Sequence, residues 1–231
     1  MADQQREIYQ SEGERYEALI SHEDYQGNIP RAIDEIVSVD GLEVLDLGAG
    51  TGRLTLILAP RAKSIRAFDL SAAMLRVCRQ RLVAGGLSNW QVSLADHRQL
   101  PLENHSADLV VSGWSVSYLA VWNPEQANQE LDKWLAEMRR VLRENGMIIL
   151  FESLGTGNES PIRLEHVEST YQWLDANGFR HKWIRTDYRF ESLDEAINLA
   201  GFFFGAEMAD RVRENRLVIL PECTGVWWRE I

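Results

Sequence analysis

The sequence predicts an α/β protein built on a doubly wound, mostly parallel sheet with helices on both of its faces. Short apolar segments alternate with amphipathic segments from residue 44 to residue 153. Such alternation is typical of parallel sheets, because each helix carries the chain back to the edge where the next strand begins. The 231 residues are 45% hydrophobic and 26% charged, which suits one domain of ordinary size with an appended subdomain.

Five strands and the helices between them are predicted in this alternating region. The predicted strands are apolar or alternating segments at residues 44–47, 64–70, 89–96, 107–114 and 147–153. A helix is predicted at residues 53–60, and a second one follows Ser71 as its N-cap. A third begins with Asn123 as N-cap and Pro124 as first helical position, and the pair Asn145 and Gly146 is predicted to end it.

The segments on either side of this region carry looser patterns. A charged helix over residues 3–21 and a short helix over residues 29–38 are predicted before it. After residue 154 we expect a helix at 163–177, a strand at 180–190, helices at 192–214 and a hairpin-like pair of strands at 216–229. The loop at residues 155–161 is the best candidate for a boundary, and the late strands are expected to rejoin the same sheet.

The composition argues against several functional classes. The formal net charge is −11, from 24 Lys and Arg against 35 Asp and Glu, which disfavours nucleic acid as a partner. Two cysteines make no disulfide framework, and the five histidines are scattered without metal-ligand spacing. The N-terminus lacks an apolar signal core, and no apolar run approaches the length of a membrane span. We therefore expect a cytoplasmic protein without a metal or membrane partner.

Three glycines follow the first predicted strand, in the segment "VLDLGAGTGRLTLILA". A strand that ends in glycines and turns into a helix lets a ligand approach the main chain and meet free N–H groups at the helix start. The dinucleotide fingerprint G-x-G-x-x-G needs a third glycine where this chain has Arg53, and Asp46 would repel a pyrophosphate. A nicotinamide oxidoreductase is therefore the disfavoured alternative.

Acidic residues stand at the ends of three successive predicted strands. Asp46 can pair with an ammonium group, and Asp69 can accept both hydroxyls of a ribose. Asp96 can accept a hydrogen bond from an adenine amino group. Because parallel strands bring their carboxyl ends to one edge of a sheet, these carboxylates fit a ligand that carries an ammonium, a ribose and an adenine but no phosphates.

The chain resembles the class I S-adenosylmethionine-dependent methyltransferases, particularly the small-molecule group called methyltransferase type 11. The resemblance covers residues 40–153 and rests on four segments in the family's order: "VLDLGAGTGRLT", "FDLSAAML", "LADHRQLPLENHSADLVVSGWSVSYL" and "EMRRVLRENGMIILFE". It implies the Rossmann-like methyltransferase fold, with a seven-stranded sheet whose last strand is antiparallel. It also implies S-adenosylmethionine as the cofactor.

The resemblance assigns site residues and segments. The methionine part of the cofactor is expected at Asp46, Gly48, Ala49 and Gly50, the ribose at Asp69, and the adenine at Leu70, Met74, Asp96 and His97. Trp114, at the end of the fourth strand, is expected at the cofactor or the acceptor. Residues 1–40 are expected to form a helical lid that carries Tyr16 and Tyr25. Residues 41–231 are then the methyltransferase domain, with a cofactor-binding half at 41–153 and an acceptor-side half with a helical insert at 154–231.

The predicted reaction is direct in-line transfer of a methyl group to a small-molecule acceptor. Positioning supplies much of the catalysis, and an acceptor that must lose a proton needs a base, for which His22, Glu152 and His166 are candidates. Two alternatives stay open: a protein or RNA methyltransferase, and a cofactor-binding regulatory or partner protein without transfer activity. We expect a monomer or a homodimer.

Overall fold

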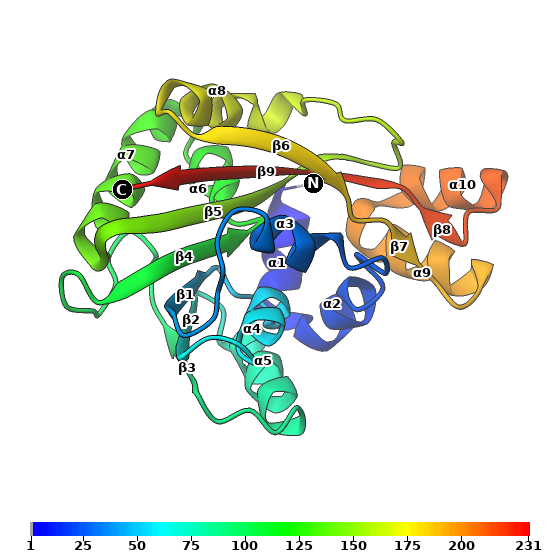
Figure 1. Ribbon diagram of the computed structural model, residues 1–231. Helices are drawn as coiled ribbons and strands as arrows, with labels where there is room; N and C mark the ends of the chain where they lie inside the picture. The colour runs from blue at the N-terminus through cyan, green and yellow to red at the C-terminus, as the bar shows by residue number, and fades with distance from the viewer. Residues whose placement is uncertain (1) are drawn as a thin grey trace.

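A seven-stranded sheet forms the centre of the protein, in the strand order β3-β2-β1-β4-β5-β9-β6 (Figure 1). The computed structural model describes residues 2–231, with side chains from Gln5 onward. The strands are β1 (Glu43–Leu47), β2 (Ser64–Asp69), β3 (Trp90–Leu94), β4 (Ala107–Gly113), β5 (Leu142–Thr156), β6 (Arg180–Arg185) and β9 (Glu222–Glu230). The first five pair in parallel, whereas β9 is antiparallel to both β5 and β6. The predicted fold class and its antiparallel last strand are confirmed.

Helices cover both faces of this sheet. They are α1 (Ala2–Ser11), α2 (Gly13–Ile20), α3 (Asn28–Asp34), α4 (Arg53–Leu58), α5 (Ala72–Ala84), α6 (Ser117–Val121), α7 (Ala127–Val141), α8 (Glu168–Ala176), α9 (Leu193–Phe204) and α10 (Ala206–Asn215). A hydrophobic core lies on each face of the sheet, and alternate residues of β1 point into one or the other. Leu45 packs with the apolar sides of α7 and α8, and Val44 packs with those of α3 and α4. The buried sheet therefore presents its carboxyl edge, rather than a face, to ligands.

The structure corrects the predicted elements at several boundaries. The helix predicted over residues 3–21 is two helices, because Glu12 has non-helical backbone angles. The helix after Pro124 starts with one 3₁₀ turn, Pro124–Gln126, and gives way to β5 at Leu142, so Asn145 and Gly146 lie inside a strand. The strand predicted at 180–190 is divided into β6 and the short β7 (Tyr188–Arg189).

The predicted hairpin at residues 216–229 is wrong. Its first strand, β8 (Ile219–Leu220), pairs with β7 in a separate two-stranded sheet, and β9 enters the main sheet between β5 and β6. Only Pro221 lies between β8 and β9, and a hairpin needs a turn of at least two residues.

The N-terminal helices share a core with the late helices. Ile8 and Leu19 are buried in one cluster with Tyr188, Phe203 and Val212, and Figure 1 shows α2 beside the unit formed by β7, β8, α9 and α10. This cluster ties the start of the chain to the helical insert that precedes β9. Among the described residues, every helix falls short of the length and apolarity needed to cross a bilayer.

Candidate functional site

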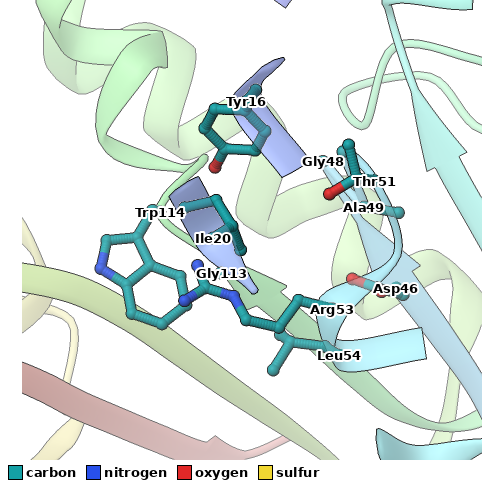
Figure 2. A pocket seen from close by; sticks show the side chains of 11 residues that line it. Tyr16, Ile20, Asp46, Gly48, Ala49, Thr51, Arg53, Leu54, Gly113 and Trp114 are labelled. Carbon is teal, nitrogen blue, oxygen red and sulfur yellow. The ribbon is translucent and has the colours of Figure 1, made fainter. Parts of the chain in front are cut away.

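A cavity of about 270 Å³ opens where the carboxyl ends of β1–β4 meet the N-terminal helices. The predicted residues that line it are Tyr16, Gly48, Gly50, Asp69, Leu70, Met74, Asp96, His97 and Trp114. A smaller cavity, about 30 Å³, adjoins it and adds the predicted Asp46 and Ala49 (Figure 2). Both are lined by Tyr16, Gly48, Gly50 and Trp114. The fold thus brings eleven of the twelve predicted cofactor residues to one continuous site.

The turn between β1 and α4 presents bare backbone to both cavities. Gly48 and Gly50 have positive φ angles of 68° and 56°, which glycine adopts without strain. A Cβ at Gly48 would lie 1.9 Å from the Oγ atom of Ser115, whereas a Cβ at Gly50 would meet nothing within 4 Å. Gly48 is therefore needed for packing, and Gly50 keeps open the space that a ligand can fill.

The carboxylate of Asp69 is fixed in place by the main chain at the edge of the larger cavity. Its Oδ2 accepts a hydrogen bond of 2.9 Å from the Gly50 N–H, and its Oδ1 accepts one of 2.7 Å from the Ser71 N–H. Burial raises the pKa of Asp69, while these backbone hydrogen bonds oppose that shift. Each oxygen keeps an acceptor site, so the carboxylate can receive two neighbouring hydroxyl groups.

At the end of β3, Asp96 and His97 stand in different electrostatic settings. Arg98 donates to both Asp96 oxygens, with Nε 2.9 Å from Oδ1 and Nη2 2.5 Å from Oδ2, and so lowers the pKa of Asp96. His97 is buried, and burial lowers its pKa to about 4, so the ring is neutral at pH 7. Its Nδ1 has no hydrogen-bond partner among the described residues. A buried ring nitrogen without a partner fits a site completed by a polar ligand.

The smaller cavity carries two buried charged side chains. Asp46 is 1% exposed, accepts a hydrogen bond of 2.5 Å from the Thr55 hydroxyl, and has its pKa raised by burial to about 7. Arg53 extends from α4 to the ring of Trp114, with its Cζ atom 3.7 Å from the ring centre (Figure 2). Trp114 itself has a positive φ of 52°, and its backbone N–H donates to the Phe151 carbonyl at 2.6 Å. The end of β4 thus holds this ring as a wall of both cavities.

The N-terminal helices contribute wall residues that sequence reasoning missed. Arg6, Tyr9 and Gln10 line the larger cavity from α1. Their spacing of three and four residues puts them on one helical face, which is the only signal in the sequence that could have found them. The Tyr9 and Tyr118 hydroxyl oxygens are 2.9 Å apart, and Ser71 donates a hydrogen bond of 2.5 Å to the Tyr9 carbonyl.

Four predicted site residues lie outside both cavities: His22, Tyr25, Glu152 and His166. His22 has its Nδ1 atom 2.9 Å from the Arg189 carbonyl, and its ring packs against Phe190. His166 is exposed. Tyr25, the twelfth predicted cofactor residue, is 40% exposed and lies under the Arg189 guanidinium. The structure therefore brings neither histidine to the wall where an acceptor would meet a base, and it places Tyr25 on the surface.

Glu152, the third candidate base, is buried behind the site rather than on its wall. Its two oxygens accept hydrogen bonds from the N–H and the hydroxyl of Ser117, at 2.9 and 2.8 Å. Burial raises its pKa to about 7. Because Ser117 begins α6, this carboxyl holds the segment that carries the wall residues Ser115 and Tyr118. In this structure Glu152 positions the wall and does not face the cavity.

Comparisons with known proteins give a family match for the middle of the chain. The family model described as "Methyltransferase domain" matches residues 45–150. Malonyl-[acyl-carrier protein] O-methyltransferase of Geobacter sulfurreducens is 35% identical over 144 residues, which is 59% of this chain and 49% of that protein. Demethylmenaquinone methyltransferase of Chlamydia pneumoniae is 28% identical over 176 residues, 71% of each chain. The chain spans about half or less of the length of most of its curated relatives.

A solved structure shares the fold over most of the chain. The [4+2]-cyclase SpnF superposes with a TM-score of 0.59 and 19% identity, and the match covers 88% of this chain and 79% of that one. The mostly parallel sheet, its antiparallel strand β9 and the glycine turn after β1 give this chain a Rossmann-like fold. Residues 45–150 thus match a methyltransferase-domain family, and the two relatives above are methyltransferases by name.

Proposed function

We propose that this protein binds S-adenosylmethionine and transfers its methyl group to a small-molecule acceptor. The observation that carries the proposal is the pair of adjoining cavities, whose lining runs from His97, through Asp69 and the open space over Gly50, to Asp46. An adenine, a ribose and an amino-acid arm fit these neighbours in that order. Asp46 supports a ligand with an ammonium group over one with a pyrophosphate, because a carboxylate repels phosphates.

The residues of this site act by positioning and by excluding water. When bound, the cofactor supplies an electrophilic methyl group on a sulfonium. Tyr9, Tyr16 and Tyr118 wall the larger cavity with aromatic surface, which keeps water from competing with the acceptor. None of the three predicted bases, His22, Glu152 and His166, lines either cavity. The proposal therefore rests on alignment of the acceptor rather than on proton abstraction by one of them.

The acceptor is proposed as a small molecule. One relative named above acts, by its name, on demethylmenaquinone, which is a small molecule, and the other on a malonyl group carried by an acyl-carrier protein. The net charge of −11 supports a non-nucleic-acid acceptor.

Cofactor binding is tested by calorimetry with S-adenosylmethionine and, separately, with NAD. We expect a defined binding isotherm with the sulfonium nucleoside and none with the dinucleotide. Binding of NAD alone would overturn the proposal. Turnover is tested by incubating the protein and S-adenosylmethionine with fractionated metabolite extracts and measuring S-adenosylhomocysteine.

A binding protein without transfer activity is the second candidate. The observation that favours it is the position of the three candidate bases, none of which faces the cavity. A protein of this fold is also named as a cyclase, so the fold alone does not decide the reaction. Tight binding of S-adenosylmethionine without formation of S-adenosylhomocysteine in any fraction would favour this candidate.

A further inference from the structure

One wall of the larger cavity has no role in the proposed binding of the cofactor. Arg6 and Gln10 line the cavity from α1, and Tyr118 and Trp122 line it from α6 and its C-terminal end. None of these four residues is among those expected at the adenine, the ribose or the amino-acid arm. We call the surface that they form the α1–α6 wall, and its chemistry indicates a second ligand.

Arg6 is a cation without an acidic partner on the α1–α6 wall. Its Cζ atom lies 5.4 Å from the centre of the Trp122 ring, and its guanidinium forms no ion pair or hydrogen bond with any residue that the structure describes. Arg98, which lines the same cavity, is paired with Asp96 and Glu130. The chain has 35 acidic residues against 24 basic ones, so a shortage of carboxylates does not explain the difference. Arg6 therefore has its charge and five N–H donors available to a ligand.

Trp122 adds a second donor without an acceptor. Its Nε1 atom is buried and has no hydrogen-bond partner in the part of the chain that the structure describes. Buried N–H groups are normally hydrogen-bonded, so this one fits a site that a ligand oxygen completes. The Tyr118 ring stacks on the Trp122 ring, with the ring centres 4.8 Å apart and an interplanar angle of 29°. This stacking holds the indole in place beside Arg6.

The lining of the larger cavity is divided by charge. Its carboxylates are Asp69, which ends β2, and Asp96, which follows β3, and both are proposed to bind the nucleoside. The donors without acceptors, those of Arg6 and Trp122, come from the α1–α6 wall instead. An anionic group is repelled by the carboxylates and attracted by the guanidinium. An anionic ligand that shares this cavity with the cofactor is therefore expected at the α1–α6 wall.

We propose that the methyl acceptor carries an anionic group, a carboxylate or a phosphate, and that Arg6 is the specificity-determining residue that binds it. The inference rests on the proposed function and names the chemical class of its acceptor. A guanidinium meets either anion with two parallel hydrogen bonds, and the Trp122 indole N–H supplies a third donor. Binding of the anion selects and orients the acceptor, and it takes no part in the displacement itself.

Small aromatic probes that differ in charge provide the test. Benzoate and phenyl phosphate carry the two kinds of anion on the same ring, benzamide is neutral, and benzylamine is a cation. Their dissociation constants are measured by NMR titration of protein saturated with S-adenosylhomocysteine, so that the cofactor's own site is filled. We expect the wild type to bind an anionic probe at least about 10-fold more tightly than benzamide or benzylamine. The tighter of the two anions shows whether the acceptor carries a carboxylate or a phosphate.

Three variants connect this preference to the α1–α6 wall. Arg6→Met removes the charge and the donors, and we expect it to bind the preferred anion about 10- to 100-fold more weakly, which corresponds to loss of a hydrogen bond to a charged group. It should bind S-adenosylhomocysteine as the wild type does, which also shows that it is folded. Trp122→Phe removes the indole N–H and should weaken the anion by a smaller factor. The matched control is Arg15→Met, because Arg15 is an exposed arginine of α2 that packs on the Phe202 ring and lines neither cavity.

The outcomes separate this inference from the proposed function. A wild type that binds S-adenosylhomocysteine but prefers neither anion over benzamide overturns the inference and leaves the proposed function intact. Equal loss of the anion in Arg6→Met and Arg15→Met does the same, and so does a loss of S-adenosylhomocysteine in Arg6→Met as large as that of the anion. A wild type that binds no S-adenosylhomocysteine overturns the proposed function and this inference with it. Loss of the anion alone, in Arg6→Met and not in Arg15→Met, supports the inference.

Discussion

The Asp69 carboxylate connects the glycine turn to the ligand cavity, because each of its oxygens accepts a backbone hydrogen bond and keeps one acceptor site. Asp69→Asn retains one acceptor oxygen and loses the charge. We expect it to weaken binding of S-adenosylhomocysteine by about 1–3 kcal/mol, as when a buried hydrogen-bonding partner is lost. Calorimetry measures this loss, and Asp194→Asn on the exposed start of α9 is the matched control. Equal affinity in the two variants would remove Asp69 from the site.

The raised pKa of Glu152 predicts how the stability of the fold depends on pH. An acid whose pKa is higher in the folded than in the unfolded protein stabilises the fold only at low pH, and this contribution is lost as the pH rises between the two values. For Glu152 the interval runs from the ordinary 4.5 to about 7. At about 1.4 kcal/mol per pKa unit, Glu152→Gln should gain up to about 3 kcal/mol relative to the wild type across this interval. Urea unfolding at several pH values measures the difference, and parallel curves would contradict it.

The site residues that were predictable from the sequence lie next to strands in the chain. Asp46 is within β1, Asp69 ends β2 and Asp96 follows β3, so the parallel order of the strands alone brings them to one edge. His22 and Tyr25 were assigned to the site because of their segment. The contacts with Arg189 that hold them outside the cavity come from far along the chain, and no local pattern reports them.

At the scale of elements, a glycine in the turn from β1 into α4 can be compared with a glycine in the loop after α5. Gly50 and Gly86 both have positive φ, 56° and 67°, and a Cβ at either would meet nothing within 4 Å. Alanine at either position should cost about 1–2 kcal/mol in the free energy of unfolding, because only the backbone is strained. Only Gly50 lines the cavities, so Gly50→Ala alone should also weaken binding of S-adenosylhomocysteine. Thermal unfolding and calorimetry measure the two effects, and equal loss of affinity at Gly86 would contradict this assignment.

The strands of the alternating region were predicted well from the sequence. The strands that pair with segments outside their own neighbourhood in the chain were not. The strands β1 to β5 follow from apolar segments that pair within one parallel region. The place of β9 between β5 and β6 depends on pairing with residues 142–156 and 180–185. The pattern of residues 216–229 indicates extended chain but does not specify the strand with which it pairs. A hairpin, in which the two halves pair with each other, is therefore the prediction from the sequence alone.

At the scale of the whole molecule, the ligand site is closed by parts that are distant in sequence. Tyr9 and Tyr16 line the larger cavity from the N-terminal helices, and both rings lie within 6.1 Å of the Phe203 ring centre in α9. A ligand in the cavity would therefore contact α1 and α2 directly and stabilise α9 through them. Helices that open independently of the sheet in the free protein should open less often when the ligand is bound.

Hydrogen exchange measures this coupling. At a concentration of S-adenosylhomocysteine 100 times its dissociation constant, binding stabilises the closed state by about 2.7 kcal/mol, so exchange in α1 and α2 should slow by up to about 100-fold. Exchange in α9 should slow by a smaller factor, because its contact with the ligand is indirect. Local exchange in α8, which lines neither cavity, should not change. Protection confined to the strand ends, with α1 and α2 unaffected, would show that these helices do not close the site.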